Sequence, residues 1–216
     1  SSNLVLTPEE IDALMRWISE RAELFRLTGG AHCAALIVAS REKVGAAGEA
    51  NAKAEGNGKT RGTGTLPQIG ERLWCLAFRE DVGRHNAVDK VIGRGLVMKI
   101  IGQPAPRHQT GTPSSGKSRL GGARFINPRH QADTRSSPAN LGLLPSSSEL
   151  ILVTSGRVAS DLAIKAIRAR IPFVISHSAP TDAAVELARN FHITLVGFAR
   201  SQRMNIYTGR QRISET

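Results

Sequence analysis

The last third of the chain repeats one pattern, in which an apolar strand is followed by a short turn and an amphipathic helix. The predicted strands are 150–154, 172–176 and 193–198, and the helices between them are 159–170 and 182–190. Apolar strands that alternate with helices form a sheet that is covered on both faces. We therefore expect an α/β fold, in the form of a three-layer α/β/α sandwich, closed by a short strand near 205–207.

The first half of the chain adds a clearly marked helix and two further strands. Thr7 and Glu10 have the spacing of a capping box, and Pro8 stands at the first helical position, so a helix is predicted to begin there. Apolar segments at 33–39 and 73–78 are predicted to be buried strands. A second helix is expected to follow 73–78, with Asn86 as its N-cap.

Two stretches lack this periodicity and are interpreted as flexible insertions within a single domain that spans 1–216. The first, 41–72, is rich in Gly, Ala, Lys, Glu and Thr. The second, 103–148, is rich in Pro, Ser, Gly and Arg, and its six Lys/Arg against one Asp give it +5 of the formal net charge of +11.

The second insertion contains GTPSSGKS, at 111–118, which fits the phosphate-loop pattern G-x-x-x-x-G-K-[ST]. That pattern binds phosphate only where a strand precedes it and a helix follows it. Two prolines occur in the preceding polar run, and Gly121 and Gly122 follow, so neither neighbour is expected. We interpret the match as a coincidence.

Composition narrows the classes of function. The surplus of positive charge favours a polyanionic partner, and it leaves a basic nucleic-acid-binding protein as an alternative. Only 4% of the residues are aromatic, so stacking platforms for single-stranded nucleic acid are not expected. Cys33 and Cys75 lie in apolar segments, as reduced thiols of a cytoplasmic protein do. We expect no metal site, no membrane span and no secretory signal.

Polar and glycine-rich segments stand next to five of the predicted strands. Ligands of α/β sheets bind at the loops that leave the carboxyl ends of strands, and these segments suit a phosphorylated heterocycle. Carboxylates accept from purine or pterin amino groups, while arginines and helix starts hold phosphate. The candidate residues are Thr28, Gly29, Gly30 and His32; Glu80, Asp81, Arg84, His85 and Asn86; Ser155, Gly156 and Arg157; 177–181; and Phe198, Ala199, Arg200, Ser201, Gln202 and Arg203.

Each segment also has a purely structural alternative. Gly29 and Gly30 could end a helix, and 79–86 could be a charged loop with internal salt bridges. Ser155 could belong to a capped helix start, Thr181 could be an N-cap, and 198–205 could be an edge hairpin with surface arginines. Taken together, the segments predict one basic rim along an edge of the sheet.

Five motifs occur in an order that resembles one family. They are LFRLTGGAHCAAL, AFREDVGRHNAVDKVIG, LVTSGRVASDLAIKA, ISHSAPTDAAVELA and TLVGFARSQRMNIYTG. In this order they resemble the formate dehydrogenase accessory sulfurtransferase family, FdhD. The resemblance implies a cytidine-deaminase-like fold. Zinc deaminases require His-x-Glu and Cys-x-x-Cys, and His32 is followed by Cys33 and Ala34, so hydrolytic deamination is not expected.

The resemblance also implies a function, a cofactor and partners. Members carry sulfur from a cysteine desulfurase to molybdenum bis(molybdopterin guanine dinucleotide), which formate dehydrogenase needs for activity, and a homodimer is suggested. The family's cofactor-binding stretch corresponds to 198–203. The family's persulfide comes from a Cys-x-x-Cys loop that this chain lacks, so we assign no catalytic residue and expect an N-terminally incomplete member. A noncatalytic protein that binds the molybdenum cofactor or a guanine nucleotide remains the alternative.

Overall fold

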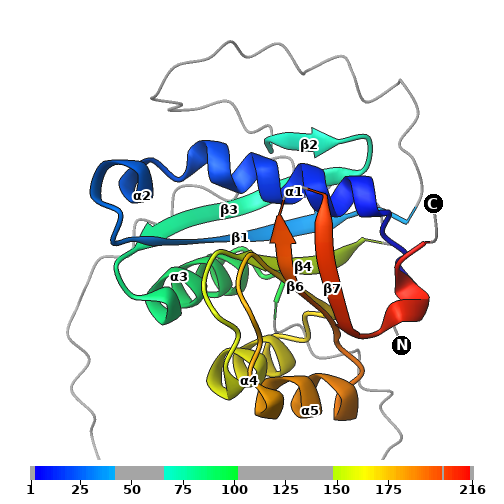
Figure 1. Ribbon diagram of the computed structural model, residues 1–216. Helices are drawn as coiled ribbons and strands as arrows, with labels where there is room; N and C mark the ends of the chain where they lie inside the picture. Colours follow the sequence, from blue (N-terminus) through cyan, green and yellow to red (C-terminus); the bar gives the residue numbers. More distant parts are fainter. Residues whose placement is uncertain (1–2, 42–65, 102–147, 201, 215–216) are drawn as a thin grey trace, which may run out of the picture.

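The computed structural model describes residues 3–41, 66–101, 148–200 and 202–214, and it forms one sheet between two layers of helices (Figure 1). The helices are α1 (Pro8–Arg21), α2 (Glu23–Thr28), α3 (Arg84–Val97), α4 (Ser160–Arg168), α5 (Asp182–Asn190) and the 3-10 helix η3 (Arg210–Arg212). The strands are β1 (His32–Ala39), β2 (Gln68–Gly70), β3 (Leu73–Asp81), β4 (Glu149–Thr154), β5 (Phe173–Ser176), β6 (Thr194–Arg200) and β7 (Arg203–Thr208).

The strand directions bring several loops to one edge of the sheet. The strand order is β2-β3-β1-β4-β5-β6-β7. Strands β4, β5 and β6 are parallel, and β1 is antiparallel to both of its neighbours, β3 and β4. Strand β3 therefore runs in the same direction as β4, β5 and β6. The carboxyl ends of these four strands meet the start of β1 at a single edge.

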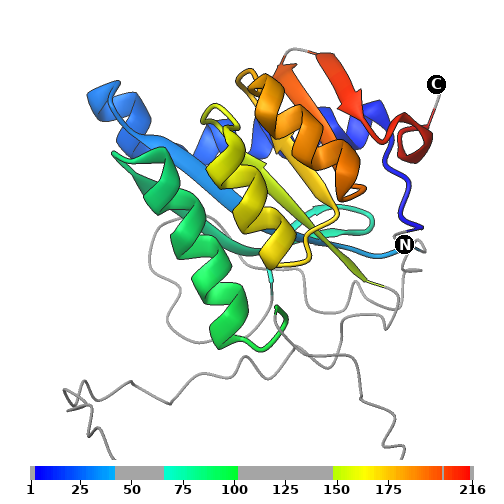
Figure 2. The same ribbon diagram turned by 90° about the horizontal axis from the view of Figure 1, so that it is seen from below.

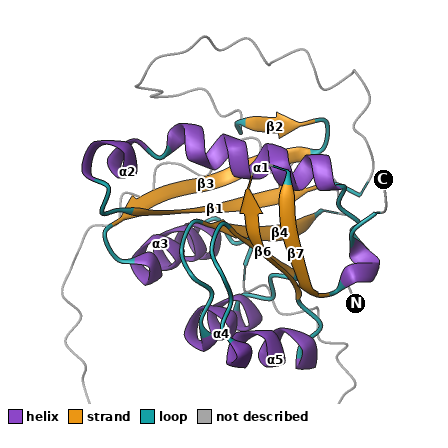
Figure 3. Ribbon diagram, viewed as in Figure 1, coloured by secondary structure: helices purple, strands orange, loops and turns teal. Residues whose placement is uncertain are grey.

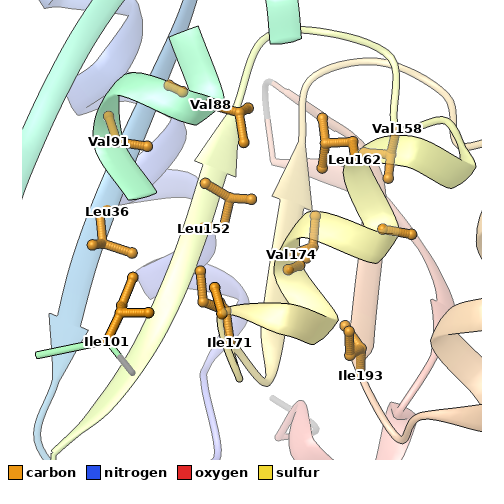
Figure 4. Close-up of a cluster of buried hydrophobic side chains, with 14 of the residues drawn as sticks. Leu36, Val88, Val91, Ile101, Leu152, Val158, Leu162, Ile171, Val174 and Ile193 are labelled. Carbon is orange, nitrogen blue, oxygen red and sulfur yellow. The ribbon is translucent and has the colours of Figure 1, made fainter. Parts of the chain in front are cut away.

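The two faces of the sheet bury separate cores, because side chains of successive strand residues point to opposite faces. Helices α3, α4 and α5 cover one face, where Leu36, Leu152 and Val174 are buried (Figures 2 and 4). Helix α1 crosses the other face (Figure 3). Ile37, next to Leu36, and Phe173, next to Val174, are buried on that face. These layers confirm the predicted α/β/α sandwich.

Several element boundaries differ from the sequence-based expectations. Asn86 is not the N-cap of α3, because the helix begins at Arg84 after Gly83. The side-chain amide of Asn86 instead donates to Asp81 Oδ1 at 3.1 Å, and the N–H of Gly83 donates to the same oxygen at 2.8 Å. Strand β3 continues to Asp81, beyond the predicted end at 78.

The predicted irregular stretch 41–72 contains a strand. Residues Gln68–Gly70 form β2 at the end of the sheet and pair with the start of β3. The remainder of that stretch, 42–65, lies outside the described residues, as do 102–147. The phosphate-loop match at 111–118 and most of the basic stretch behind the nucleic-acid alternative are therefore not described.

The two ends of the described chain pair with each other. Leu6 forms a parallel bridge with Ile213: its N–H donates to the carbonyl of Arg212, and its own carbonyl accepts from the N–H of Ser214, both at 2.9 Å. Figures 1 and 2 show the segment before α1 running beside η3. Within the described ranges, no helix is both long enough and apolar enough to cross a lipid bilayer.

Candidate functional site

A cavity of about 1070 Å³ lies beside the hairpin of β6 and β7. Its lining is basic and amide-rich, with some apolar surface, and no acidic side chain lines it in the described part of the chain. The lining residues are Pro8, Phe198, Arg200, Gln202, Arg203, Met204, Asn205, Ile206, Arg210, Ile213 and Ser214. Three guanidinium groups, two amides and one aromatic ring suit an anion that carries a flat ring.

The hairpin presents these side chains because its two strands separate into an irregular turn. Arg200 and Arg203 are register partners, and the register shifts between Gly197 and Arg200. Phe198 and Gln202 have φ angles of 51° and 62°, in the left-handed region. Phe198 is 37% exposed and borders the cavity.

The neighbouring strand end also reaches this hairpin. The N–H of Phe198 donates to the carbonyl of Ser178 at 3.2 Å. His177, half-buried at the end of β5, has a pKa below its ordinary value, because burial disfavours the charged imidazolium and the Arg200 guanidinium repels it. The predicted loop 177–181 therefore adjoins the cavity, with His177 within the electrostatic reach of Arg200.

The predicted residues after β3 are brought together, but with partners inside the protein. The Glu80 carboxylate accepts the N–H groups of Leu24 and Phe25, at 3.0 and 3.1 Å, at the start of α2. The Asp81 carboxylate accepts from Lys90 Nζ at 2.5 Å, besides Gly83 and Asn86. These donors, Lys90 first, lower the pKa of Asp81 to about 2.

The turn after β4 is tied to β1 and to the start of α3. The Ser155 hydroxyl accepts the N–H of Cys33 at 2.9 Å. Gly156 lies against Arg84 so closely that a Cβ at this position would be 2.8 Å from the Arg84 Cβ. This approach requires glycine. Arg157 is exposed beside the turn.

Two further predicted side chains, Arg84 and His85, stand at the start of α3. His85 Nε2 lies 2.5 Å from Asp161 Oδ2. Arg84 Nε is buried and has no hydrogen-bond partner among the described residues. Gly29 adopts a left-handed φ of 65° and ends α2, while His32 stands opposite Asp81 at the start of β1.

The predicted rim is thus one edge of the sheet, but only its β6 end lines the cavity. Four of the predicted residues line the cavity: Phe198, Arg200, Gln202 and Arg203. Ala199 is buried in the core on the α1 face, and Ser201 lies outside the described residues. The candidates at 28–32, 80–86 and 155–157 line other parts of the edge.

Sequence reasoning missed Arg210 as a lining residue, whereas Asn205 belongs to the segment 198–205 that it singled out. Asn205 is in β7, and Arg210 follows Gly209, whose left-handed φ of 72° turns the chain at the end of that strand. At the other loops, polar residues next to the end of a predicted strand marked the candidate site. Arg210 stands in the same position after β7, so the same criterion would have identified it.

Neither cysteine presents a reactive sulfur. Cys33 is 3% exposed and Cys75 is 4% exposed. Burial raises the pKa of both thiols, that of Cys75 to about 12. An attacking thiol must be ionised and accessible, so neither residue has the environment of a nucleophile. Over the described residues, no group of three or more His, Cys, Asp and Glu is arranged to hold a metal ion.

Comparisons with known proteins agree on one relationship. The sequence is 28% identical over 210 residues to a protein named sulfur carrier protein FdhD from Bacillus licheniformis, which covers 97% of this chain and 50% of that protein. A protein of the same name from Sulfurisphaera tokodaii is 29% identical over 211 residues, which covers 98% of this chain and 53% of that protein. The chain therefore spans about half the length of these curated relatives.

A solved structure shares the fold. A protein from Desulfotalea psychrophila, described as a formate dehydrogenase accessory protein, superposes with a TM-score of 0.55 at 22% identity. The superposition covers 99% of this chain and 61% of that protein. The FdhD/NarQ family model matches residues 45–106 and 144–214, which is more than half of the sequence. The chain belongs to the FdhD/NarQ family.

Proposed function

We propose that this chain is the cofactor-binding part of a cytoplasmic sulfur carrier that serves formate dehydrogenase. The proposed ligand is molybdenum bis(molybdopterin guanine dinucleotide), the sulfur donor is a cysteine desulfurase, and the assembly is a homodimer. One observation carries the proposal. The stretch 198–203, which the family resemblance associates with the cofactor, contributes Phe198, Arg200, Gln202 and Arg203 to a basic cavity.

The chemistry of the cavity fits a guanine nucleotide portion of such a ligand. Its volume of about 1070 Å³ is at the upper end of the ~300–1,000 Å³ usual for small-molecule sites. Arg200, Arg203 and Arg210 supply the fork-shaped donors that pair with phosphate oxygens. Phe198 offers a ring face for a base, and the Asn205 amide can both donate to and accept from the base edge.

The remaining rim residues are proposed to bind the rest of this large ligand. The candidates at 28–32, 80–86 and 155–157 share the sheet edge with the cavity, and Arg157 is exposed there. When bound, the cofactor supplies the molybdenum centre that takes up sulfur. The role proposed for this chain's own residues is to hold the ligand's phosphates and base at the edge of the sheet.

A noncatalytic binding protein is the second candidate, and the buried cysteines favour it. Both thiols are inaccessible and have raised pKa values. The two candidates differ in whether sulfur becomes attached to this chain. Incubation with a cysteine desulfurase and radiolabelled cysteine, followed by non-reducing electrophoresis, should leave this chain unlabelled if it binds without carrying sulfur. Label that reducing agents release would support transfer by this chain.

Calorimetry with GDP tests the proposed site. We expect the Arg200→Ala, Arg203→Ala double variant to bind GDP at least tenfold more weakly, because each charge-assisted hydrogen bond contributes about 1.5–3 kcal/mol. Arg168→Ala is the matched control, since this exposed arginine lies in the last turn of α4. Equal GDP affinity in the double variant and the wild type would refute the placement of the site.

A second measurement reports on the same site without any assay of activity. An anion held by Arg200 offsets its positive charge, so the pKa of His177 should rise when GDP binds. An NMR pH titration of the His177 ring, with and without GDP, measures this shift. A pKa unchanged at saturating GDP would place the ligand elsewhere on the protein.

A further inference from the structure

The turn between β6 and β7 is held in a conformation that a chain does not adopt readily by itself. Phe198 and Gln202 both have left-handed φ angles, and neither is glycine. Such conformations are strained in residues other than glycine and persist only where the surrounding structure restrains them. Arg200 and Arg203 flank Gln202 and line the cavity, so the directions of their side chains depend on this restraint.

The restraint on Gln202 comes from helix α1. The Asp12 carboxylate accepts the N–H of Gln202 through Oδ1 at 3.2 Å. Its other oxygen, Oδ2, lies 3.1 Å from Nε of Arg16, one helical turn further along. The Asp12 side chain is only 11% exposed, while Gln202 is exposed, so the hydrogen bond joins a largely buried carboxylate to a turn at the protein surface.

Helix α1 is itself a firm support. It begins with a complete capping box between Thr7 and Glu10, and it packs on the sheet through Ile11, Leu14 and Ile18. Asp12 lies one turn after Pro8, which also lines the cavity. The same helix therefore borders the cavity and restrains the turn that supplies two of its arginines.

We propose that Asp12 is a positioning residue for this site. Its carboxylate fixes the backbone of Gln202, and this keeps the Arg200 and Arg203 guanidinium groups directed at an anion in the cavity. The inference rests on the proposed function, in which the cavity binds the phosphates of a nucleotide. Neither the motif at 198–203 nor the cavity lining includes Asp12, so the role proposed for it is indirect, through the turn.

Three variants separate this role from general stabilisation. Asp12→Ala removes the acceptor, Asp12→Asn keeps an oxygen acceptor but loses the charge, and Arg16→Ala removes the ion pair alone. Each is compared with the wild type for GDP affinity by calorimetry, for thermal stability, and for the hydrogen-exchange rate of the Gln202 amide. Asp12→Asn serves as the conservative rescue, and it also covers the case in which Asp12→Ala folds poorly.

We expect Asp12→Ala to lose GDP affinity and protection of the Gln202 amide. Asp12→Ala should bind GDP about tenfold more weakly and exchange the Gln202 amide at least tenfold faster, whereas Asp12→Asn and Arg16→Ala should stay close to the wild type in both measurements. If Asp12→Ala keeps wild-type affinity, or if Asp12→Asn loses as much as Asp12→Ala, the positioning role is wrong.

The exchange measurement keeps the inference separate from the proposed function. If wild-type protein does not bind GDP, the proposed nucleotide site fails, and the Gln202 amide still decides whether Asp12 restrains the turn. Unchanged exchange in Asp12→Ala would overturn the inference whatever the protein binds. Faster exchange in Asp12→Ala, with normal exchange in Asp12→Asn, would support it.

Discussion

Among single residues, Asp81 has the most strongly organised surroundings on the rim. Its folded-state pKa of about 2 lies below the value of about 3.9 in an unfolded chain, with Lys90 as the main cause. The ionised carboxylate therefore stabilises the fold above about pH 4. This contribution disappears as the pH falls from about 4 to about 2.

Replacing the main partner should raise this pKa. We expect Lys90→Met to shift the pKa of Asp81 upward but to leave it below the ordinary value, because Gly83 and Asn86 still donate to the carboxylate. An NMR titration of the side-chain carboxyl carbon measures the change. Lys165→Met is the control, since Lys165 pairs with Asp89 instead, 2.7 Å away. An Asp81 pKa that does not move in Lys90→Met would contradict the assignment of the cause.

The two cysteines give a second test at this scale. A thiol with a pKa of about 12 is ionised to about one part in 10,000 at pH 8, and Cys75 is buried as well. We expect both thiols to resist a disulfide reagent such as DTNB in the native protein and to react at once in guanidinium chloride. Rapid labelling of either cysteine in the native state would show an accessible sulfur and would reopen transfer by this chain.

Among the elements, helix α2 depends on one side chain more than on packing. It has no buried residue, and Leu27 is 77% exposed. The Glu80 carboxylate accepts two of its first N–H groups, as an N-cap side chain does. Loss of such a cap costs about 0.5–2 kcal/mol. A six-residue helix is not stable alone, so this cost should act locally.

We therefore expect Glu80→Ala to unfold α2 without unfolding the domain. The amides of Arg26 and Gly29, which bond to Ala22 and Phe25 within this segment, should lose protection from hydrogen exchange. The amides of β1 should keep theirs. Glu20→Ala, which removes an exposed carboxylate from α1, should change neither. Protection of α2 that survives in Glu80→Ala would show that packing holds the helix after all.

The same helix shows where sequence reasoning reaches its limit. Strands and helices with buried faces, such as β1, β4 and α5, were predicted to within a few residues, because burial imposes a periodic pattern on the sequence. Helix α2 has no buried residue, and its first N–H groups donate to Glu80, more than fifty residues later in the chain. No local pattern encodes that contact.

The candidate site was predictable to a similar extent. The sheet edge and the stretch 198–203 follow from strand order and motif, and four of its six residues line the cavity. Asn86 was wrongly assigned as the N-cap of α3 because Asn is a residue type that often caps helices. In the structure, Asp81 at the end of β3 accepts from both Gly83 and Asn86, and the helix begins two residues before Asn86. Asp12 could not be recognised, because its partner Gln202 is distant in sequence and the bond involves only the backbone of that residue.

At the scale of the whole molecule, the pairing of the two chain ends contributes to stability. Leu6 is fully buried between these ends and the core, whereas its neighbour Val5 is 41% exposed. We expect Leu6→Ala to lower the free energy of unfolding by about 2–5 kcal/mol, the usual cost of emptying a buried leucine site. Val5→Ala should change it by about 0.5 kcal/mol or less. Urea denaturation measures both, and similar losses in the two variants would contradict the burial argument.

The cavity is built from both of these ends. Pro8 borders it from the start of α1, and Ile213 and Ser214 border it from the segment after η3. Because synthesis runs from the amino end, a nascent chain cannot enclose the cavity before the residues near 213 have left the ribosome. The cavity can therefore form only after both segments have been synthesised and have paired with each other.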